Sequence, residues 1–211
     1  MEKEHTSHKR SMVISYLALR RAVGILGVAF PFILVIGYLI AGGHGIRYSI
    51  SSYYHTPVGD IFVGVLCAVA LFLFSYTGYD KRDNITGDLA GIFALGVAFF
   101  PTADDLAGII HLISASLFFL LLAYYSIFLF TKGSDHPTPA KKKRNRLYRI
   151  CGYVIVACIL LALLYSILPT LQSSLSNLRP IFWLETVMLW AFGLSWLTKG
   201  KVLLGDALEN R

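Results

Sequence analysis

The sequence predicts an all-α integral membrane protein, folded as a single six-helix bundle over residues 1–211 with both termini in the cytoplasm. Of the 211 residues, 56% are hydrophobic and 15% are charged, and the mean hydropathy is +0.64. An ordinary soluble domain is roughly 45–50% apolar and about 25% charged, so one soluble core could not bury this much apolar sequence. The composition therefore excludes a disordered chain and argues against a soluble enzyme.

Six apolar runs approach the length that a helix needs to cross the ~30 Å hydrocarbon core of a bilayer. In lipid the backbone must satisfy its own hydrogen bonds, and these runs lack the alternation of a barrel strand, so we expect helices. The expected helices cover residues 22–43, 61–79, 89–103, 107–130, 150–168 and 181–198.

Two of these helices have features that set their shape. Pro31 lies in the middle of the first run and predicts a kink, because proline removes an intrahelical hydrogen bond. The third run is short and has small residues at Gly87, Gly91 and Ala94, which favour close helix packing. We therefore predict a central third helix that ends below the membrane surface at Pro101.

The distribution of Lys and Arg over the loops predicts the orientation. Seventeen of the 19 basic residues lie in the N-terminal tail, the second and fourth loops and the C-terminal segment, whereas the other loops hold only Arg47 and Arg179. Cytoplasmic loops carry the excess of Lys and Arg. The net charge of +7 therefore indicates how the chain sits in a membrane, which we expect to be the bacterial inner (plasma) membrane. The first ~20 residues lack the apolar core of a cleavable signal peptide.

The segment 131–149 is predicted to be a basic cytoplasmic loop. Its run from Lys141 to Arg146 would attract anionic lipid headgroups at about 1 kcal/mol per basic residue. The alternative is a simple topology determinant. A nucleic-acid partner is not expected, because the loop is short and has few interleaved aromatic residues. The sequence does not indicate an oligomeric state.

Polar side chains collect at the outer side of the predicted bundle and suggest a binding site there. Glu185 lies about five residues beyond Pro180, deep enough in the membrane to need a partner. Tyr53 and Tyr54 suit either a binding mouth or the aromatic belt at the headgroup level. The candidate binding residues are Arg47, Tyr53, Tyr54, Asp104, Asp105, Ser114, Arg179 and Glu185.

Two kinds of chemistry are compatible with these residues. His55 and His111 with a carboxylate, Asp60 or Glu185, could bind a cation such as zinc and activate water. Ser51 and His55, four residues apart, could form a hydrolytic pair oriented by Asp60. The chain has no His-x-x-x-His or His-Glu-x-x-His motif.

A structural hydrogen-bond network is the alternative to both kinds of chemistry. In such a network Glu185 pairs with Arg47, Arg179 or a histidine and simply closes the bundle.

The run Ile50-Ser-Ser-Tyr-Tyr-His-Thr56, Asp60, and the Gly96-Val-Ala-Phe-Phe-Pro-Thr102 end of the third helix resemble bacterial multi-helix membrane proteins with a Frag1/DRAM-like pattern. This resemblance covers most of the first four helices and implies no activity.

Ser51, His55 and Asp60 also have a fainter likeness to the alkaline ceramidase and progestin/adipoQ receptor superfamily of metal-dependent amide hydrolases. There a serine, a histidine four residues later and an aspartate help to build a zinc site. That superfamily has seven helices and a late His-x-x-x-His pair, which this chain lacks.

Three functions follow as expectations. The first is an outward-facing polar pocket that binds a lipid headgroup or another small ligand without catalysis. The alternatives are a zinc-type lipid or amide hydrolase at the outer leaflet, and a proton-coupled transporter or channel subunit with Glu185 and His111 as relay groups. Whether the protein is an enzyme, and whether it holds a cofactor, stays open in the sequence.

Overall fold

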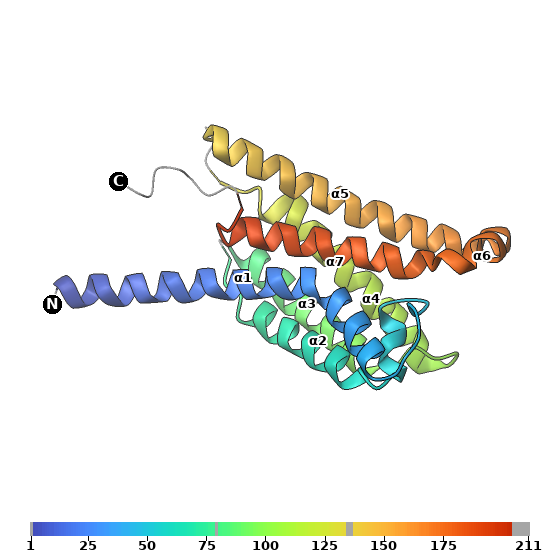
Figure 1. Cartoon of the computed structure of the whole chain (residues 1–211). Helices are drawn as coiled ribbons and strands as arrows, with labels where there is room; N and C mark the ends of the chain where they lie inside the picture. Colours follow the sequence, from blue (N-terminus) through green and yellow to red (C-terminus); the bar gives the residue numbers. More distant parts are fainter. Residues whose placement is uncertain (1, 79, 134–136, 204–211) are drawn as a thin grey trace.

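The computed structural model describes residues 2–78, 80–133 and 137–203, and these residues form an all-α bundle (Figure 1). Three short turns lie between the helices: 3₁₀ turns η1 (Ser51–His55) and η3 (Ser176–Leu178) and a π-helical turn η2 (Tyr125–Leu129). The described α-helices are α1 (Glu2–Ile40), α2 (Gly59–Phe74), α3 (Lys81–Phe99), α4 (Leu106–Tyr124), α5 (Pro139–Ile167), α6 (Pro169–Leu175) and α7 (Pro180–Lys199).

Four segments are long and apolar enough to cross a membrane. They are Leu17–Ile40 in α1, Leu106–Leu129 in α4 and η2, Pro139–Ile167 in α5 and Pro180–Lys199 in α7. The helix α2 is also apolar, but it has only 16 residues. By length and composition this is a possible multi-span helical membrane protein.

The start of α3 differs from the prediction, because polar side chains extend the helix beyond its apolar run. The Asp80 carboxylate accepts hydrogen bonds from the backbone N–H groups of Arg82 and Asp83, and the Asp83 carboxylate accepts from the Asp80 N–H. This reciprocal capping begins the helix at Lys81, eight residues before the expected start. The third helix is therefore not short, and α2, which ends at Phe74, is the shorter of the two.

The start of α5 differs for the same reason. The Thr138 hydroxyl accepts a hydrogen bond from the Lys141 N–H, and Pro139 occupies the first turn, where its missing N–H costs nothing. Most of the predicted basic loop, from residue 139 onward, is therefore helical. The short helix α6 was not predicted.

The helix α1 is longer than its apolar run, since it begins at Glu2. Pro31 lies inside α1, and Figure 1 shows α1 changing direction in its second half, as the sequence predicts for a proline kink.

The helix α7 is the most buried of the four candidate spans. About half of α7 is buried (56%), against 28–33% of the other three candidate spans. It packs against α1, α4 and α5, whereas α3 lies between α2 and α4. Both helices thus lie between other helices, and a central third helix stays a prediction.

Glycines allow the closest helix contacts. A Cβ atom built on Gly193 of α7 would lie 2.7 Å from the Gly24 carbonyl oxygen of α1, and one built on Gly24 would lie 2.9 Å from the Gly193 carbonyl oxygen. On α3, a Cβ atom at Gly87 would lie 2.9 Å from the Leu73 carbonyl oxygen of α2. The predicted close packing of α3 is thus confirmed at this contact.

The long helices run roughly side by side, so the connecting segments gather at two opposite ends of the bundle (Figure 1). The basic end carries Asp80, Lys132, Lys141 and Lys199, and there the Arg21 Nε donates to the Gly200 carbonyl oxygen at 2.9 Å. The opposite end, which we call the loop end, carries residues 41–58, 100–105 and 168–179.

Candidate functional site

Glu185 of α7 fastens the segment 41–58 to the bundle at the loop end. Its carboxylate accepts a hydrogen bond from the Ile50 N–H at 2.5 Å, and Ser51, the next residue, lines the same cavity as Glu185. Glu185 is half-buried and Ser51 is buried. The sequence identified Glu185 as a residue that needs a partner, and its described partner belongs to the first loop.

Arg47 and Arg179, which the sequence suggests as partners of Glu185, are both exposed and have other surroundings. Arg47 is exposed and its guanidinium lies over the Tyr38 ring, with 6.0 Å from Cζ to the ring centroid. Arg179 is exposed and adopts a left-handed backbone conformation with φ of 53° between η3 and α7. The Glu185 carboxylate therefore bonds to a backbone N–H group, that of Ile50, where the sequence suggests a charged side chain.

A cavity of about 30 Å³ lies beside Glu185. One water needs roughly 10–15 Å³ on this measure, so the cavity holds about two water-sized groups. Glu185 and Ser51 are its polar side chains. Its other lining residues are apolar, and four of them are phenylalanines: Phe30, Phe62, Phe118 and Phe119.

His55 and His111 hold the segment that follows α3. The His111 Nδ1 lies 2.7 Å from the Phe100 carbonyl oxygen, and the His55 Nε2 lies 2.8 Å from the Thr102 carbonyl oxygen. A carbonyl oxygen only accepts, so we assign the proton to these two nitrogens. Because Pro101 lacks an N–H and ends α3, the last carbonyl groups need donors from outside the helix.

His111 has one ring nitrogen without a described partner. The side chain is only 4% exposed, and its Nε2 has no hydrogen-bond partner among the described residues. Ser114, which the sequence places on the same helical face, is also buried, and it packs against Gly96 of α3.

The aspartates of the loop end are exposed and lie at helix starts. The Asp105 carboxylate accepts hydrogen bonds from the Ala107 N–H at 2.8 Å and the Gly108 N–H at 3.2 Å, and so caps α4. Asp60 lies in the first turn of α2, where a carboxylate is favoured by the helix dipole. Asp104 is exposed next to the cap.

Tyr53 supports the first loop from within. It is fully buried, its hydroxyl accepts from the Arg47 N–H at 3.3 Å, and its ring meets the Tyr38 ring edge-on at 5.6 Å. Burial raises the pKa of Tyr53 above its ordinary value. Tyr54 is half-buried and packs edge-on against His55 and Phe62.

The candidate metal ligands do not converge in the part of the chain that the structure describes. Within residues 17–78, 80–133 and 137–203, no three His, Cys, Asp or Glu side chains are grouped so that they could hold a metal ion. This holds for His55, Asp60, His111 and Glu185. Ser51 lines the cavity beside Glu185, whereas the His55 Nε2 bonds to the Thr102 carbonyl oxygen, so the two residues of the predicted hydrolytic pair have different surroundings.

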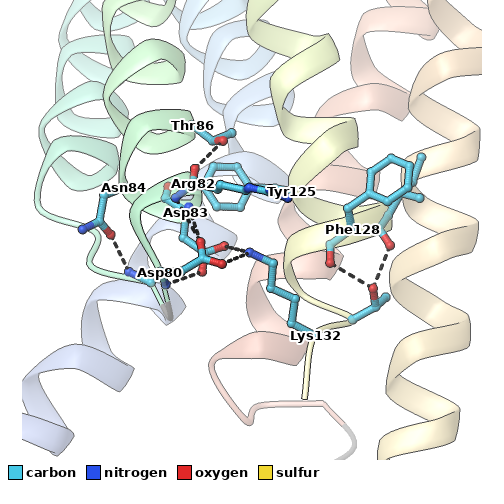
Figure 2. Close-up of polar contacts among 11 residues, drawn as sticks. Asp80, Arg82, Asp83, Asn84, Thr86, Tyr125, Phe128 and Lys132 are labelled. Carbon is cyan, nitrogen blue, oxygen red and sulfur yellow. Dashed lines mark hydrogen bonds and ion pairs between the residues drawn. The ribbon is translucent and has the colours of Figure 1, made fainter. Parts of the chain in front are cut away.

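An ion-pair group lies at the basic end (Figure 2). The Lys132 Nζ is 2.9 Å from an Asp80 carboxylate oxygen and 3.3 Å from one of Asp83, which is 2% exposed. The Tyr125 hydroxyl donates to the Asp83 backbone carbonyl at 2.6 Å. The hydrogen bond from Lys132 lowers the pKa of Asp80. Desolvation lowers the pKa of Lys132, but hydrogen bonds to Asp80 and Asp83 outweigh it and raise that pKa overall.

Sequence reasoning missed a second cavity, of about 120 Å³, at the basic end. It lies where Arg20, Lys141, Arg144, Lys199 and Lys201 meet. Basic residues close to the ends of several apolar runs were the available signal. The sequence predicts that they set the orientation and that the run Lys141–Arg146 attracts anionic headgroups, but nothing in a sequence shows which of them face one another.

Comparison with known proteins found no match to this chain among protein-family models, curated proteins or solved structures. The two resemblances noted in the sequence therefore remain predictions.

Proposed function

We propose that the chain is an integral membrane protein that crosses the bilayer six times, with its basic end in the cytoplasm. The support for α2 and α3 as crossing helices is their position. The turn between them is tied by Asp80 to Lys132, beyond the end of the candidate span Leu106–Leu129. The excess of Lys and Arg at that end supports the orientation.

We further propose that the protein binds a primary ammonium group in the cavity beside Glu185, as part of a lipid headgroup or a small amine. The observation that carries this proposal is a carboxylate placed in a small cavity with four phenylalanines. A carboxylate in apolar surroundings favours a cationic partner and repels anions. Aromatic rings also attract cations.

The size and hydrogen-bonding capacity of the cavity select the ligand. A volume of about 30 Å³ suits a primary ammonium group and not a trimethylammonium group. A carboxylate has about four acceptor positions, and the Ile50 N–H occupies one of them. Other positions of Glu185 remain for an ammonium N–H.

Binding of ethanolamine tests this proposal, with choline as the bulky analogue. Calorimetry on protein in phosphatidylcholine nanodiscs would compare wild type, Glu185→Gln and Asp60→Asn, which neutralises an exposed carboxylate at the same end. We expect saturable ethanolamine binding to wild type and Asp60→Asn, at least tenfold weaker binding to Glu185→Gln, and weaker binding of choline. Absence of ethanolamine binding to wild type, or equal binding to Glu185→Gln, would overturn the proposal.

Proton-coupled transport is a second candidate, favoured by the buried His111 Nε2 that has no partner among the described residues. Under this alternative, Glu185 and His111 carry protons across the loop end. Wild-type protein in liposomes would then dissipate an imposed pH gradient, and Glu185→Gln and His111→Gln would each abolish the flux. Identical gradients in protein-free and wild-type liposomes would remove this candidate.

A further inference from the structure

Five cationic side chains from separate parts of the sequence surround the cavity of about 120 Å³ at the basic end. Arg20 comes from α1, Lys141 and Arg144 from the first turns of α5, and Lys199 and Lys201 from the end of α7 and the residues after it. The cavity has room for about eight water-sized groups at ~15 Å³ each, enough for a tetrahedral oxyanion.

Packing and hydrogen bonds fix the walls of this cavity. The Lys199 Nζ lies 5.1 Å from the centroid of the Phe130 ring, which is almost fully buried. The Lys141 Nζ donates to the Lys132 carbonyl oxygen at 2.6 Å. The bond from Arg21 to the Gly200 carbonyl oxygen holds the chain between the two lysines of the α7 end. These contacts hold the cationic groups in place around the cavity.

Positive charge is in excess around the cavity. Lys199 is repelled by the charges of Arg20, Lys141 and Arg144, and the described carboxylate that attracts it is that of Asp83. Asp83 is itself bonded to Lys132. Each of the five cations has contacts of its own, and an anion is favoured by their number and by their convergence on one cavity.

We propose that this cavity binds a phosphate group, carried by an anionic phospholipid of the cytoplasmic leaflet or by a soluble phosphate. A bound anion relieves the repulsion among the cations. Arginine presents a planar set of donors that matches phosphate oxygens, and lysine adds point charges. The site lies at the end of the bundle that we place at the cytoplasmic membrane surface, where anionic headgroups are concentrated. It is independent of the ammonium cavity at the loop end.

The basic run of α5 provides its own control. Lys141 and Arg144 line the cavity, whereas Lys142 and Lys143, next to them in the sequence, are exposed and do not line it. Neutralising either pair removes two positive charges from the same helical turns. If the protein is simply attracted to anionic surfaces, the two double substitutions should weaken binding equally. If the cavity binds phosphate, only the substitution of Lys141 and Arg144 should weaken it.

The experiment uses the full chain, purified in detergent and freed of lipid. Native mass spectrometry measures retention of phosphatidylglycerol against phosphatidylcholine, and calorimetry measures binding of inorganic phosphate. The proteins compared are wild type, Lys141→Gln/Arg144→Gln and Lys142→Gln/Lys143→Gln. Lys199→Gln/Lys201→Gln tests the opposite wall, and thermal unfolding shows whether each variant is folded.

We expect one saturable phosphate-bearing ligand on wild type and on Lys142→Gln/Lys143→Gln, with at least tenfold weaker binding to both cavity variants. Retention of phosphatidylglycerol without binding of inorganic phosphate would identify the lipid as the source, and the converse would identify a soluble phosphate. Equal binding to the two α5 double variants would overturn the proposal, as would a wild-type protein that binds neither probe. If a cavity variant does not fold, the other cavity variant decides.

Discussion

The Glu185 carboxylate of α7 and the backbone N–H of Ile50 lie 2.5 Å apart, although 135 residues separate them in the sequence. This contact joins the first loop to the most buried of the candidate spans. Hydrogen bonds to a charged group stabilise a fold by about 1.5–3 kcal/mol each in net terms. This carboxylate is therefore one of the groups that hold the first loop against α7, together with the bond from the Phe182 N–H to the Tyr48 carbonyl oxygen at 3.1 Å.

Replacing Glu185 by Ala should lower the free energy of unfolding by roughly 1–3 kcal/mol, because the Ile50 N–H loses its acceptor. Glu185→Gln should cost less, since an amide oxygen can still accept. Thermal unfolding in detergent measures the change, and Asp60→Ala is the control at an exposed carboxylate. Equal melting temperatures for Glu185→Ala and Asp60→Ala would contradict this account of the loop.

Replacing His111 by Phe should destabilise the protein more than replacing His55 by Phe. Both changes keep a ring and remove a hydrogen bond to the segment after α3, but the His111 ring is buried and His55 is exposed. The bond from His111 is partly buried, so losing it should cost about 1–3 kcal/mol, whereas water can replace the donor at the exposed bond from His55. The melting temperatures of the two variants check the order. A larger drop in melting temperature for His55→Phe than for His111→Phe would contradict a stabilising role of the bond between His111 and the Phe100 carbonyl oxygen.

The ion pair of Lys132 with Asp80 should give a defined pH dependence. The pKa of Asp80 is lowered, so its contribution to stability is present above its unfolded pKa of about 3.9 and is lost as pH falls through the lower folded value. The pKa of Lys132 is raised, so its contribution is complete below its unfolded pKa of about 10.4 and is lost as pH rises through the higher folded value.

Lys132→Met should therefore lower the melting temperature by about 2–4 °C between roughly pH 5 and 9. The difference from wild type should shrink below about pH 4. Lys142→Met, an exposed lysine of α5, is the control and should show little change. A difference that is constant down to pH 2 would contradict the assignment to Asp80.

Adding one methyl group at Gly193 should weaken the contact between α1 and α7. The new Cβ atom would lie 2.6 Å from a Val28 methyl carbon and 2.7 Å from the Gly24 carbonyl oxygen, so the helices must separate. The control is Gly64→Ala on α2, where a Cβ atom meets nothing within 4 Å. Gly64→Ala should keep or raise the melting temperature, because Ala favours helix by about 1 kcal/mol over Gly. Equal stability of the two variants would show that α1 and α7 do not depend on this close approach.

The apolar runs predict the number and order of the long helices well, because lipid-exposed helices must be apolar along their length. They predict helix ends poorly. Asp80 and Thr138 begin α3 and α5 in polar sequence, where hydrophobicity carries no information. Capping residues beside Lys81 and Pro139 were the physical signal that would have corrected both boundaries.

The sequence predicts which side chains form the candidate site, but it does not predict the groups to which they are hydrogen-bonded. Glu185 and His111 stood out as titratable groups at membrane depth, and both have specific contacts in the structure. Their partners are backbone groups of Ile50 and Phe100, which have no side-chain signature in a sequence. The convergence of Arg20 with Lys199 depends on how α1 packs against α7, and helix packing cannot be derived from the composition of either helix.

The most direct test of the six-crossing account is the accessibility of single cysteines to a membrane-impermeant maleimide. Cys67, Cys151 and Cys158 are first replaced by Ala. Gly45→Cys then reports on the first loop, and Lys81→Cys on the turn between α2 and α3. The account predicts that Gly45→Cys is labelled in intact cells, whereas Lys81→Cys is labelled only after permeabilisation. Labelling of Lys81→Cys in intact cells, or its protection after permeabilisation, would contradict six crossings with the basic end in the cytoplasm.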